Sequence, residues 1–209
     1  MSKKKDKEEI VFKIITIGDS NVGKTSIIRR YIYNVFEPQN ISTIGVAFSF
    51  KEITLENGKT IKLRLVDTAG QEKFKSVAKS YYKNSDGVLF VFDINNVESF
   101  ENISEWIQCF EDNHTGKDNI PRFLIGNKSD LEHKVTEEEI NKFLEKHNNK
   151  YKFVSTSALD NINIDKVFQD IAEEIYKIYL TTVNKGQSKI VIDKYKNDQG
   201  NRHCICNFN

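Results

Sequence analysis

A glycine-rich segment that ends in lysine and threonine lies near the start of the chain. It reads Gly18-Asp19-Ser20-Asn21-Val22-Gly23-Lys24-Thr25 and has the spacing Gly-x-x-x-x-Gly-Lys-Thr. Glycines at this spacing let backbone N–H groups turn toward phosphate oxygens. The lysine then neutralises the β- and γ-phosphates, and the threonine hydroxyl binds Mg²⁺. These residues predict a nucleoside triphosphate site.

The segments on either side of this loop have the patterns that such a site requires. Residues 10–17 are rich in β-branched and aromatic side chains, which is typical of a buried strand. Residues 26–32 place apolar side chains at helical spacing. A strand, a tight loop and a helix in this order give the spacing its meaning, so a coincidental glycine-rich turn is the weaker interpretation.

A second polar segment, Asn127-Lys128-Ser129-Asp130, follows an apolar run. A carboxylate at Asp130 can accept two hydrogen bonds from the N1–H and amino groups of guanine. Adenine offers no such pair, and the carboxylate left unpaired disfavours ATP. Ser157 and Ala158 follow the next strand-like run, where a backbone N–H can reach the guanine carbonyl. Alone, residues 127–130 are equally consistent with a polar loop, but with the phosphate loop they predict a guanine nucleotide.

The rest of the chain alternates between strand-like and helix-like segments. Two strand-like runs, 46–55 and 60–66, are joined across Asn57-Gly58, a strong hairpin signal. Further strands are expected at 87–93, 122–125 and 151–155, and helices at 74–83, 97–112, from 136 onward and at 164–180. This order predicts an α/β fold with a mostly parallel sheet, one antiparallel strand and ligands at the carboxyl ends of the strands.

Composition and charge set the limits of this domain. The chain has 209 residues and a net charge of +1, which argues neither for nor against a nucleic-acid partner. No apolar run approaches the roughly 18 residues of a membrane-spanning helix. We expect one domain at 10–180, a flexible N-terminus at 1–9 and a flexible tail at 181–209, in which five basic residues outnumber two acidic ones.

With these motifs in place, the chain resembles the Ras superfamily of small GTPases, and most closely its Rab branch, over about residues 10–180. The segments that carry the Rab resemblance are Ile44-Gly45-Val46-Ala47-Phe48, Asp67-Thr68-Ala69-Gly70-Gln71-Glu72, Tyr81-Tyr82-Lys83 and the cysteine-bearing tail. The resemblance implies a P-loop small-GTPase fold, with a six-stranded, mostly parallel sheet, one antiparallel strand and helices on both faces.

The resemblance also implies a function. The chain is expected to be a GTP/GDP switch that hydrolyses GTP slowly and recruits effectors to control vesicle trafficking. Its expected partners are an exchange factor, a GTPase-activating protein, a GDI or escort protein, and effectors. It is expected to cycle between the cytosol and the cytoplasmic face of an endomembrane, with a monomeric G domain and no nucleic-acid partner.

Individual roles carry over onto matching positions. The cofactors are GTP or GDP and Mg²⁺, and Gln71 is expected to orient the water that attacks the γ-phosphate. The metal ligands are expected to be Thr25, Thr43 and, through a water, Asp67. The nucleotide-binding residues are expected to be Ser20, Asn21, Val22, Gly23, Lys24, Thr25, Ser26, Phe36, Thr43, Gly70, Asn127, Lys128, Asp130, Ser157 and Ala158.

In the phosphate loop, Asn21 replaces a frequent glycine, and three positions outside this loop also depart from the Rab pattern. Rabs usually present an aromatic triad to effectors; Phe48 and Tyr81 match it, but Val66 stands where tryptophan is usual. A smaller residue removes a large anchor from this predicted effector surface. Ala47 also replaces a common acidic residue, and Leu159 replaces the usual lysine after Ala158.

The tail carries Cys204 and Cys206, which resemble the paired cysteines that Rabs carry for two geranylgeranyl groups. Here Asn207-Phe208-Asn209 follow them, and Cys206 alone makes a poor CaaX box. The alternatives are an unmodified tail and a metal site at His203-Cys204-Ile205-Cys206, which lacks a second cluster of ligands. Two lipids and a basic tail would hold the chain on an anionic membrane surface.

Three other functions match the sequence less well than a switch does. A nucleotide kinase needs an acceptor pocket or a lid, and the guanine motif and residues 67–72 argue against one. A GTP-binding scaffold, or another Ras-superfamily regulator with little useful turnover, is disfavoured by Gln71 and Thr43. The cysteines disfavour a soluble transport GTPase without lipid.

Overall fold

The computed structural model describes residues 9–38, 43, 45–70, 75–116 and 119–184. The helices are α1 (Lys24–Tyr33), α2 (Lys75–Tyr82), α3 (Val97–Glu101), α4 (Ile103–Asn113), α5 (Glu137–Lys146) and α6 (Ile164–Asn184). The strands are β1 (Val11–Ile17), β2 (Val46–Thr54), β3 (Thr60–Thr68), β4 (Gly87–Asp93), β5 (Arg122–Asn127) and β6 (Lys152–Ser155).

The six strands form one sheet in the order β2-β3-β1-β4-β5-β6. Every pairing is parallel except that of β2 with β3, which are joined by the predicted hairpin. Gly58 has a φ of 78°, and the Leu55 N–H donates to the Lys59 carbonyl across the turn. The predicted fold class, a mostly parallel six-stranded sheet with one antiparallel strand, is confirmed.

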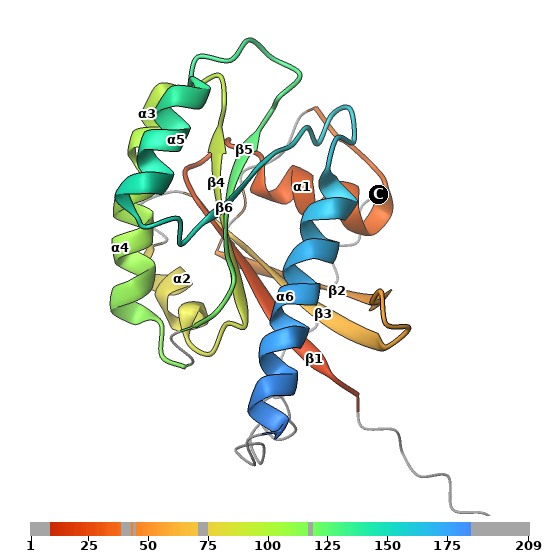
Figure 1. The fold of residues 1–209 in the computed structure, drawn as a ribbon. Helices are drawn as coiled ribbons and strands as arrows, with labels where there is room; N and C mark the ends of the chain where they lie inside the picture. Colours follow the sequence, from red (N-terminus) through yellow and green to blue (C-terminus); the bar gives the residue numbers. More distant parts are fainter. Residues whose placement is uncertain (1–8, 39–42, 44, 71–74, 117–118, 185–209) are drawn as a thin grey trace, which may run out of the picture.

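Helices cover both faces of the sheet (Figure 1), with α1 and α6 on one face and α2 to α5 on the other. The inner strands are apolar on both sides because helices cover both faces, and successive side chains point to opposite faces. In β1, Phe12 and Ile14 pack with α1 and α6, whereas Ile15 and Ile17 pack with α2 and α4. Two hydrophobic cores therefore hold the sheet rigid, and the ends of its strands have fixed positions.

Two helices differ from the sequence-based expectation. The helix expected at 97–112 is divided at Asn102 into α3 and α4, and the Asn102 side chain donates to Asp19. The last helix continues past residue 180 to Asn184, and the Thr181 and Thr182 hydroxyls donate to the Ile178 carbonyl. The helix therefore extends into the segment that we expected to be tail.

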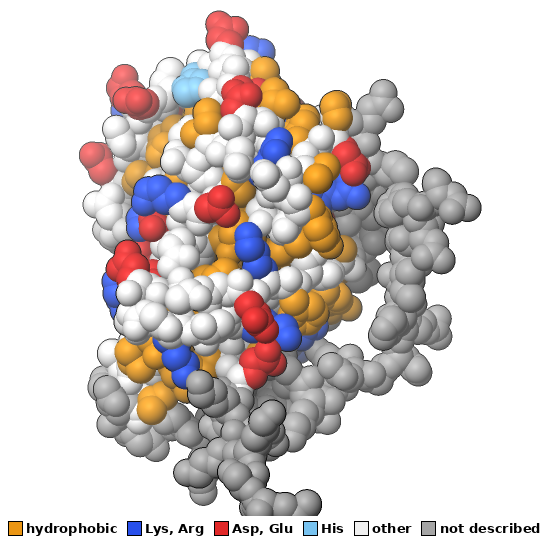
Figure 2. Space-filling view, turned by 90° about the vertical axis from the view of Figure 1, so that its right-hand side faces the viewer, with side chains coloured by type: hydrophobic (Ala, Val, Ile, Leu, Met, Phe, Trp, Pro, Cys, Tyr) orange, Lys and Arg blue, Asp and Glu red, His pale blue; other side chains and the backbone are white. Residues whose placement is uncertain are grey.

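The surface of the described residues mixes charges of both signs. Figure 2 shows Lys and Arg side chains interspersed with Asp and Glu on the face that it presents. Among the described helices, none has both the length and the hydropathy needed to cross a membrane.

Candidate functional site

The phosphate loop connects the carboxyl end of β1 to the first turn of α1. Gly23 is the N-cap of α1 with a φ of 96°. A Cβ at Gly23 would lie 2.2 Å from the Asn127 side-chain nitrogen, so both the backbone angle and the space require glycine. The backbone N–H groups at the start of α1 and the positive end of its dipole create a site for anions here.

Lys24 lies under this loop with only 5% of its surface exposed. Its Nζ donates to the Gly18 carbonyl at 2.9 Å and to the Asp19 carbonyl at 2.6 Å. An ammonium has three N–H groups, so one remains for a ligand. Burial lowers the pKa of Lys24 to about 8, although the carboxylates of Asp67 and Asp19 oppose this shift.

The lowered pKa of Lys24 predicts a pH dependence. The folded state binds fewer protons than the unfolded state between about pH 8 and 10.5, so the stability of the free protein should rise over this window. Above pH 8 the ligand-binding ammonium is lost, and GDP affinity should fall by up to about tenfold per pH unit. Displacement of a fluorescent GDP analogue between pH 7 and 9, below the ionisation of guanine N1–H, measures this affinity, and a constant affinity would contradict a phosphate-binding role for Lys24.

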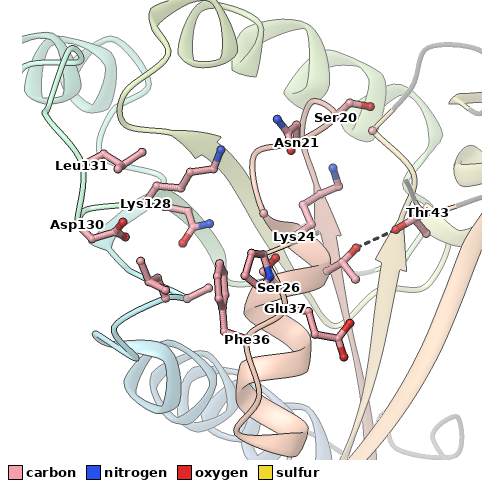
Figure 3. A pocket seen from close by; sticks show the side chains of 17 residues that line it. Ser20, Asn21, Lys24, Ser26, Phe36, Glu37, Thr43, Lys128, Asp130 and Leu131 are labelled. Carbon is pink, nitrogen blue, oxygen red and sulfur yellow. Dashed lines mark hydrogen bonds between the residues drawn. The ribbon is translucent and has the colours of Figure 1, made fainter. Parts of the chain in front are cut away.

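Three oxygen-bearing side chains meet beside the phosphate loop. The Thr25 hydroxyl donates to Asp67 Oδ2 at 2.7 Å, and it lies 2.8 Å from the Thr43 hydroxyl (Figure 3). Asp67 comes from the carboxyl end of β3, and Thr25 from the first turn of α1. The structure therefore brings together the three predicted metal ligands from separate parts of the chain.

The donor set and its burial fit Mg²⁺. Asp67 is 5% exposed, and its Oδ1 is buried with no hydrogen-bond partner. Burial raises the pKa of Asp67, although the hydrogen bond from Thr25 and the nearby Lys24 ammonium oppose this. A hard divalent cation prefers carboxylate, hydroxyl and water oxygens and would offset the cost of burying this charge.

The second predicted motif lies at the carboxyl end of β5. The Asn127 amide donates to the Val22 carbonyl at 2.8 Å, which links this strand to the phosphate loop. The Ser157 hydroxyl donates to Asp130 Oδ1 at 2.5 Å, so it fixes the orientation of the carboxylate. Lys128 has a φ of 65°, and its Nζ lies 2.6 Å from Asp93 Oδ2.

One pocket of about 620 Å³ connects the two motifs. In Figure 3, Lys128, Asp130 and Leu131 lie at one end of it, and Ser20, Asn21 and Thr43 lie at the other. Phe36 lies between the ends. The residues that line the pocket are Ser20, Asn21, Gly23, Lys24, Thr25, Ser26, Phe36, Glu37, Pro38, Thr43, Gly70, Asn127, Lys128, Asp130, Leu131, Ala158 and Leu159.

A few predicted site residues lie elsewhere. Val22 and Ser157 are buried and do not line the pocket; they act on it through the contacts with Asn127 and Asp130. Gln71 lies outside the described residues, as do Cys204 and Cys206.

The structure adds pocket features that sequence reasoning missed. Leu131 and Leu159, both about half exposed, line the base end of the pocket. The Arg30 guanidinium donates to the carbonyls of Ala158 and Leu159 at 2.8 and 2.9 Å, which ties α1 to the base-binding loop. The replacement of the usual Rab lysine by Leu159 was visible in the sequence and could have drawn attention to this position. No local pattern pointed to Arg30.

The structure describes all three residues of the predicted effector surface, and Val66 requires a correction. Phe48 is 39% exposed, and its ring centroid lies 5.3 Å from that of Tyr81. Val66 is 0% exposed, although it pairs with Phe48 across the β2–β3 ladder. The small side chain packs into the core beneath the aromatic pair, so Val66 offers no contact surface of its own.

Comparisons with known proteins agree with this geometry. A sequence model of the Ras family matches residues 13–177. The Ras-related protein YPTC6 of Chlamydomonas reinhardtii is 38% identical in an alignment that covers 99% of each chain. The matched region contains the phosphate loop, the guanine motif, and Thr43 and Asp67, which lie beside Thr25. The chain therefore belongs to the Ras family of small GTPases, as a Rab-type member that hydrolyses GTP.

Proposed function

We propose that this Rab-type GTPase binds GTP and GDP with Mg²⁺ in the pocket between α1 and β5, and that the bound nucleotide sets its affinity for effectors in vesicle trafficking. One observation carries the proposal: a single pocket of about 620 Å³ connects Lys24 and Thr25 with Asp130. A nucleotide has an anionic end and a base end, and the chemistry of the pocket matches both.

At the phosphate end, Lys24 and the backbone amides of residues 20–25 hold the β- and γ-phosphates. Thr25, Thr43 and Asp67 hold Mg²⁺, which supplies positive charge that offsets charge on the phosphate oxygens. The Gly70 amide contacts the γ-phosphate. The buried, unpaired Oδ1 of Asp67 supports this assignment.

At the base end, Asp130 accepts hydrogen bonds from the N1–H and amino groups of guanine. The Ser157 hydroxyl holds this carboxylate in place, and the Ala158 N–H donates to the guanine carbonyl. Phe36 and the Lys128 stem contact the flat base from the pocket walls. Adenine would leave Asp130 unpaired, so the site selects guanine.

Hydrolysis should be slow without a partner. Arg29 forms an ion pair with Glu37, Arg30 contacts the loop at 158–159, and the Arg64 guanidinium lies 4.7 Å from the centre of the Phe48 ring. None of these arginines lines the pocket of the described residues. Gln71 orients the attacking water, and a partner protein supplies the positive charge that stabilises the transition state.

The expected result is a slow intrinsic rate that a partner accelerates. In Ras, an activating protein that supplies an arginine accelerates hydrolysis about 10⁵-fold. Single-turnover hydrolysis of preloaded GTP by the purified full-length chain measures the intrinsic rate. A rate of several turnovers per second without a partner would contradict this part of the proposal. A loaded chain that no activating protein accelerates would favour a GTP-binding scaffold.

The switch follows from which contacts depend on the γ-phosphate. Thr43 and Gly70 belong to two segments, at about 35–47 and 68–80, that the γ-phosphate and Mg²⁺ would hold in one arrangement. Loss of the phosphate would release both segments. Effectors, exchange factors, activating proteins and GDI or escort proteins would therefore distinguish the two nucleotide states. Phe48 and Tyr81 offer effectors an aromatic pair next to these segments in the sequence.

We also propose that the domain at 10–180 is joined to a membrane by its tail. Cys204 and Cys206 would carry two prenyl groups, and the basic residues around them would add attraction to anionic lipids. Two signals of this kind are enough for stable but reversible anchoring. The chain would then act at the cytoplasmic face of an endomembrane and cycle with the cytosol.

A further inference from the structure

We propose that Asp19 is a positioning residue: α4 holds its carboxylate, and this contact fixes the carbonyl that orients the Lys24 ammonium toward the phosphates. The inference rests on the proposed function, because it concerns how the same pocket holds a nucleoside diphosphate. It adds a role for residues outside the pocket lining.

Both oxygens of the Asp19 carboxylate accept hydrogen bonds from the segment that contains α4. Oδ1 accepts from the Trp106 indole Nε1–H at 2.6 Å, and Oδ2 accepts from the Asn102 amide at 2.8 Å. Hydrogen bonds to an ionised group are shorter and roughly twice as strong as neutral ones. Trp106 is only 2% exposed, so its ring gives the carboxylate an anchor that cannot move independently of the core.

The break between α3 and α4 places the second donor. Asn102 lies between Glu101, the last residue of α3, and Ile103, the first residue of α4. Its side chain forms no capping hydrogen bond to α4 and instead donates to Asp19. The interruption of the expected continuous helix therefore coincides with a contact to the phosphate loop, 83 positions away in the sequence.

The backbone of Asp19 transmits this restraint to Lys24. The Asp19 carbonyl accepts the shorter of the two hydrogen bonds from Lys24 Nζ, at 2.6 Å. On the other side, Gly70 packs so closely that a Cβ there would lie 2.3 Å from the Asp19 carbonyl carbon. Asp19 is thus held between the segment that contains α4 and Gly70. A shift of its carbonyl would turn the Lys24 ammonium away from the phosphate position.

The test compares two ligands that differ by one phosphate. GDP has the β-phosphate that Lys24 binds, and GMP does not. Titration calorimetry on the full-length chain should show GDP affinity about tenfold lower in Asp19→Ala, with GMP affinity within twofold of the wild type. Asp19→Asn should restore GDP affinity to within threefold, because an amide oxygen accepts from Trp106 and a rotated Asn102 amide accepts from the new NH₂ group.

A spectroscopic measurement follows the contact itself. The chain has one tryptophan, so a ¹H–¹⁵N spectrum contains a single indole N–H signal that needs no assignment. In Asp19→Ala this signal should move upfield because the carboxylate acceptor is lost. Gln108→Ala, an exposed change elsewhere on α4, is the matched control and should leave both the signal and the GDP affinity unchanged.

Each outcome decides the inference. An unmoved indole signal in Asp19→Ala would show that the contact is absent, and an unchanged GDP affinity would show that it does not reach Lys24. Equal weakening of GDP and GMP would mean that Asp19 supports the fold rather than the lysine. A wild-type chain that binds no GDP would overturn the proposed function as well, so the two failures are distinguishable.

Discussion

Asp130→Asn is expected to reduce affinity for GDP by about 10³-fold or more and to create affinity for xanthosine diphosphate. Guanine presents two donors to residue 130, and an amide cannot accept both without placing its own NH₂ against one of them. Xanthine presents an N1–H donor and a carbonyl acceptor, which match the amide. The Ser157 hydroxyl still has an oxygen to bond, so the orientation of the side chain is kept.

Competition between the two diphosphates for the purified variant measures this reversal. Asp160→Asn is the matched control, because Asp160 is exposed, follows Leu159 and changes the local charge equally without facing the base. The control should keep the preference of the wild type for GDP. If Asp130→Asn kept this preference too, another residue would have to read the base.

The second large effect concerns the metal. Removal of Mg²⁺ with EDTA is expected to speed GDP release from the wild type by about 10²-fold or more, because the cation neutralises charge that the phosphates and Asp67 share. In Asp67→Asn, release should already be fast and EDTA should add little. The buried, unpaired Oδ1 of Asp67 is the structural reason for this expectation.

Release of a fluorescent GDP analogue, with and without Mg²⁺, provides the measurement. Asp165→Asn is the control, because its carboxylate is 75% exposed and contacts Lys51 rather than the site. This variant should respond to EDTA as the wild type does. An Asp67→Asn chain that still required Mg²⁺ for slow release would remove Asp67 from the metal site.

The features predicted from sequence depend on short segments with strong local constraints. The phosphate loop was predictable because glycine, lysine and threonine occur at fixed spacing between a strand and a helix. The hairpin at Asn57-Gly58 was predictable because the turn needs a residue with positive φ, which Gly58 supplies at 78°. The alternation of strands and helices then predicted which strand ends would meet.

The features missed depend on contacts between distant segments. Trp106 and Asp19 are 87 positions apart, and neither residue type nor spacing reveals that they meet. The expected continuous helix at 97–112 gave no reason to break at Asn102, because the partner that accompanies the break belongs to another segment. Burial of Val66 followed from packing under Phe48 and Tyr81, whereas the resemblance had placed it on a surface.

The roles assigned to Gln71 and to the tail cysteines stay predictions, since they lie outside the described residues. Guanine nucleotide binding does not require them. The two residues that we propose to contact the phosphates and the base, Lys24 and Asp130, line one pocket among the described residues.

The most direct measurement is competition between GDP and ADP for the full-length chain in the presence of Mg²⁺. An equal concentration of GDP should displace about half of a bound fluorescent GDP analogue, whereas a thousandfold excess of ADP should displace little of it. Displacement by ADP at the same concentration as GDP would contradict a guanine-selective site and the account built on it.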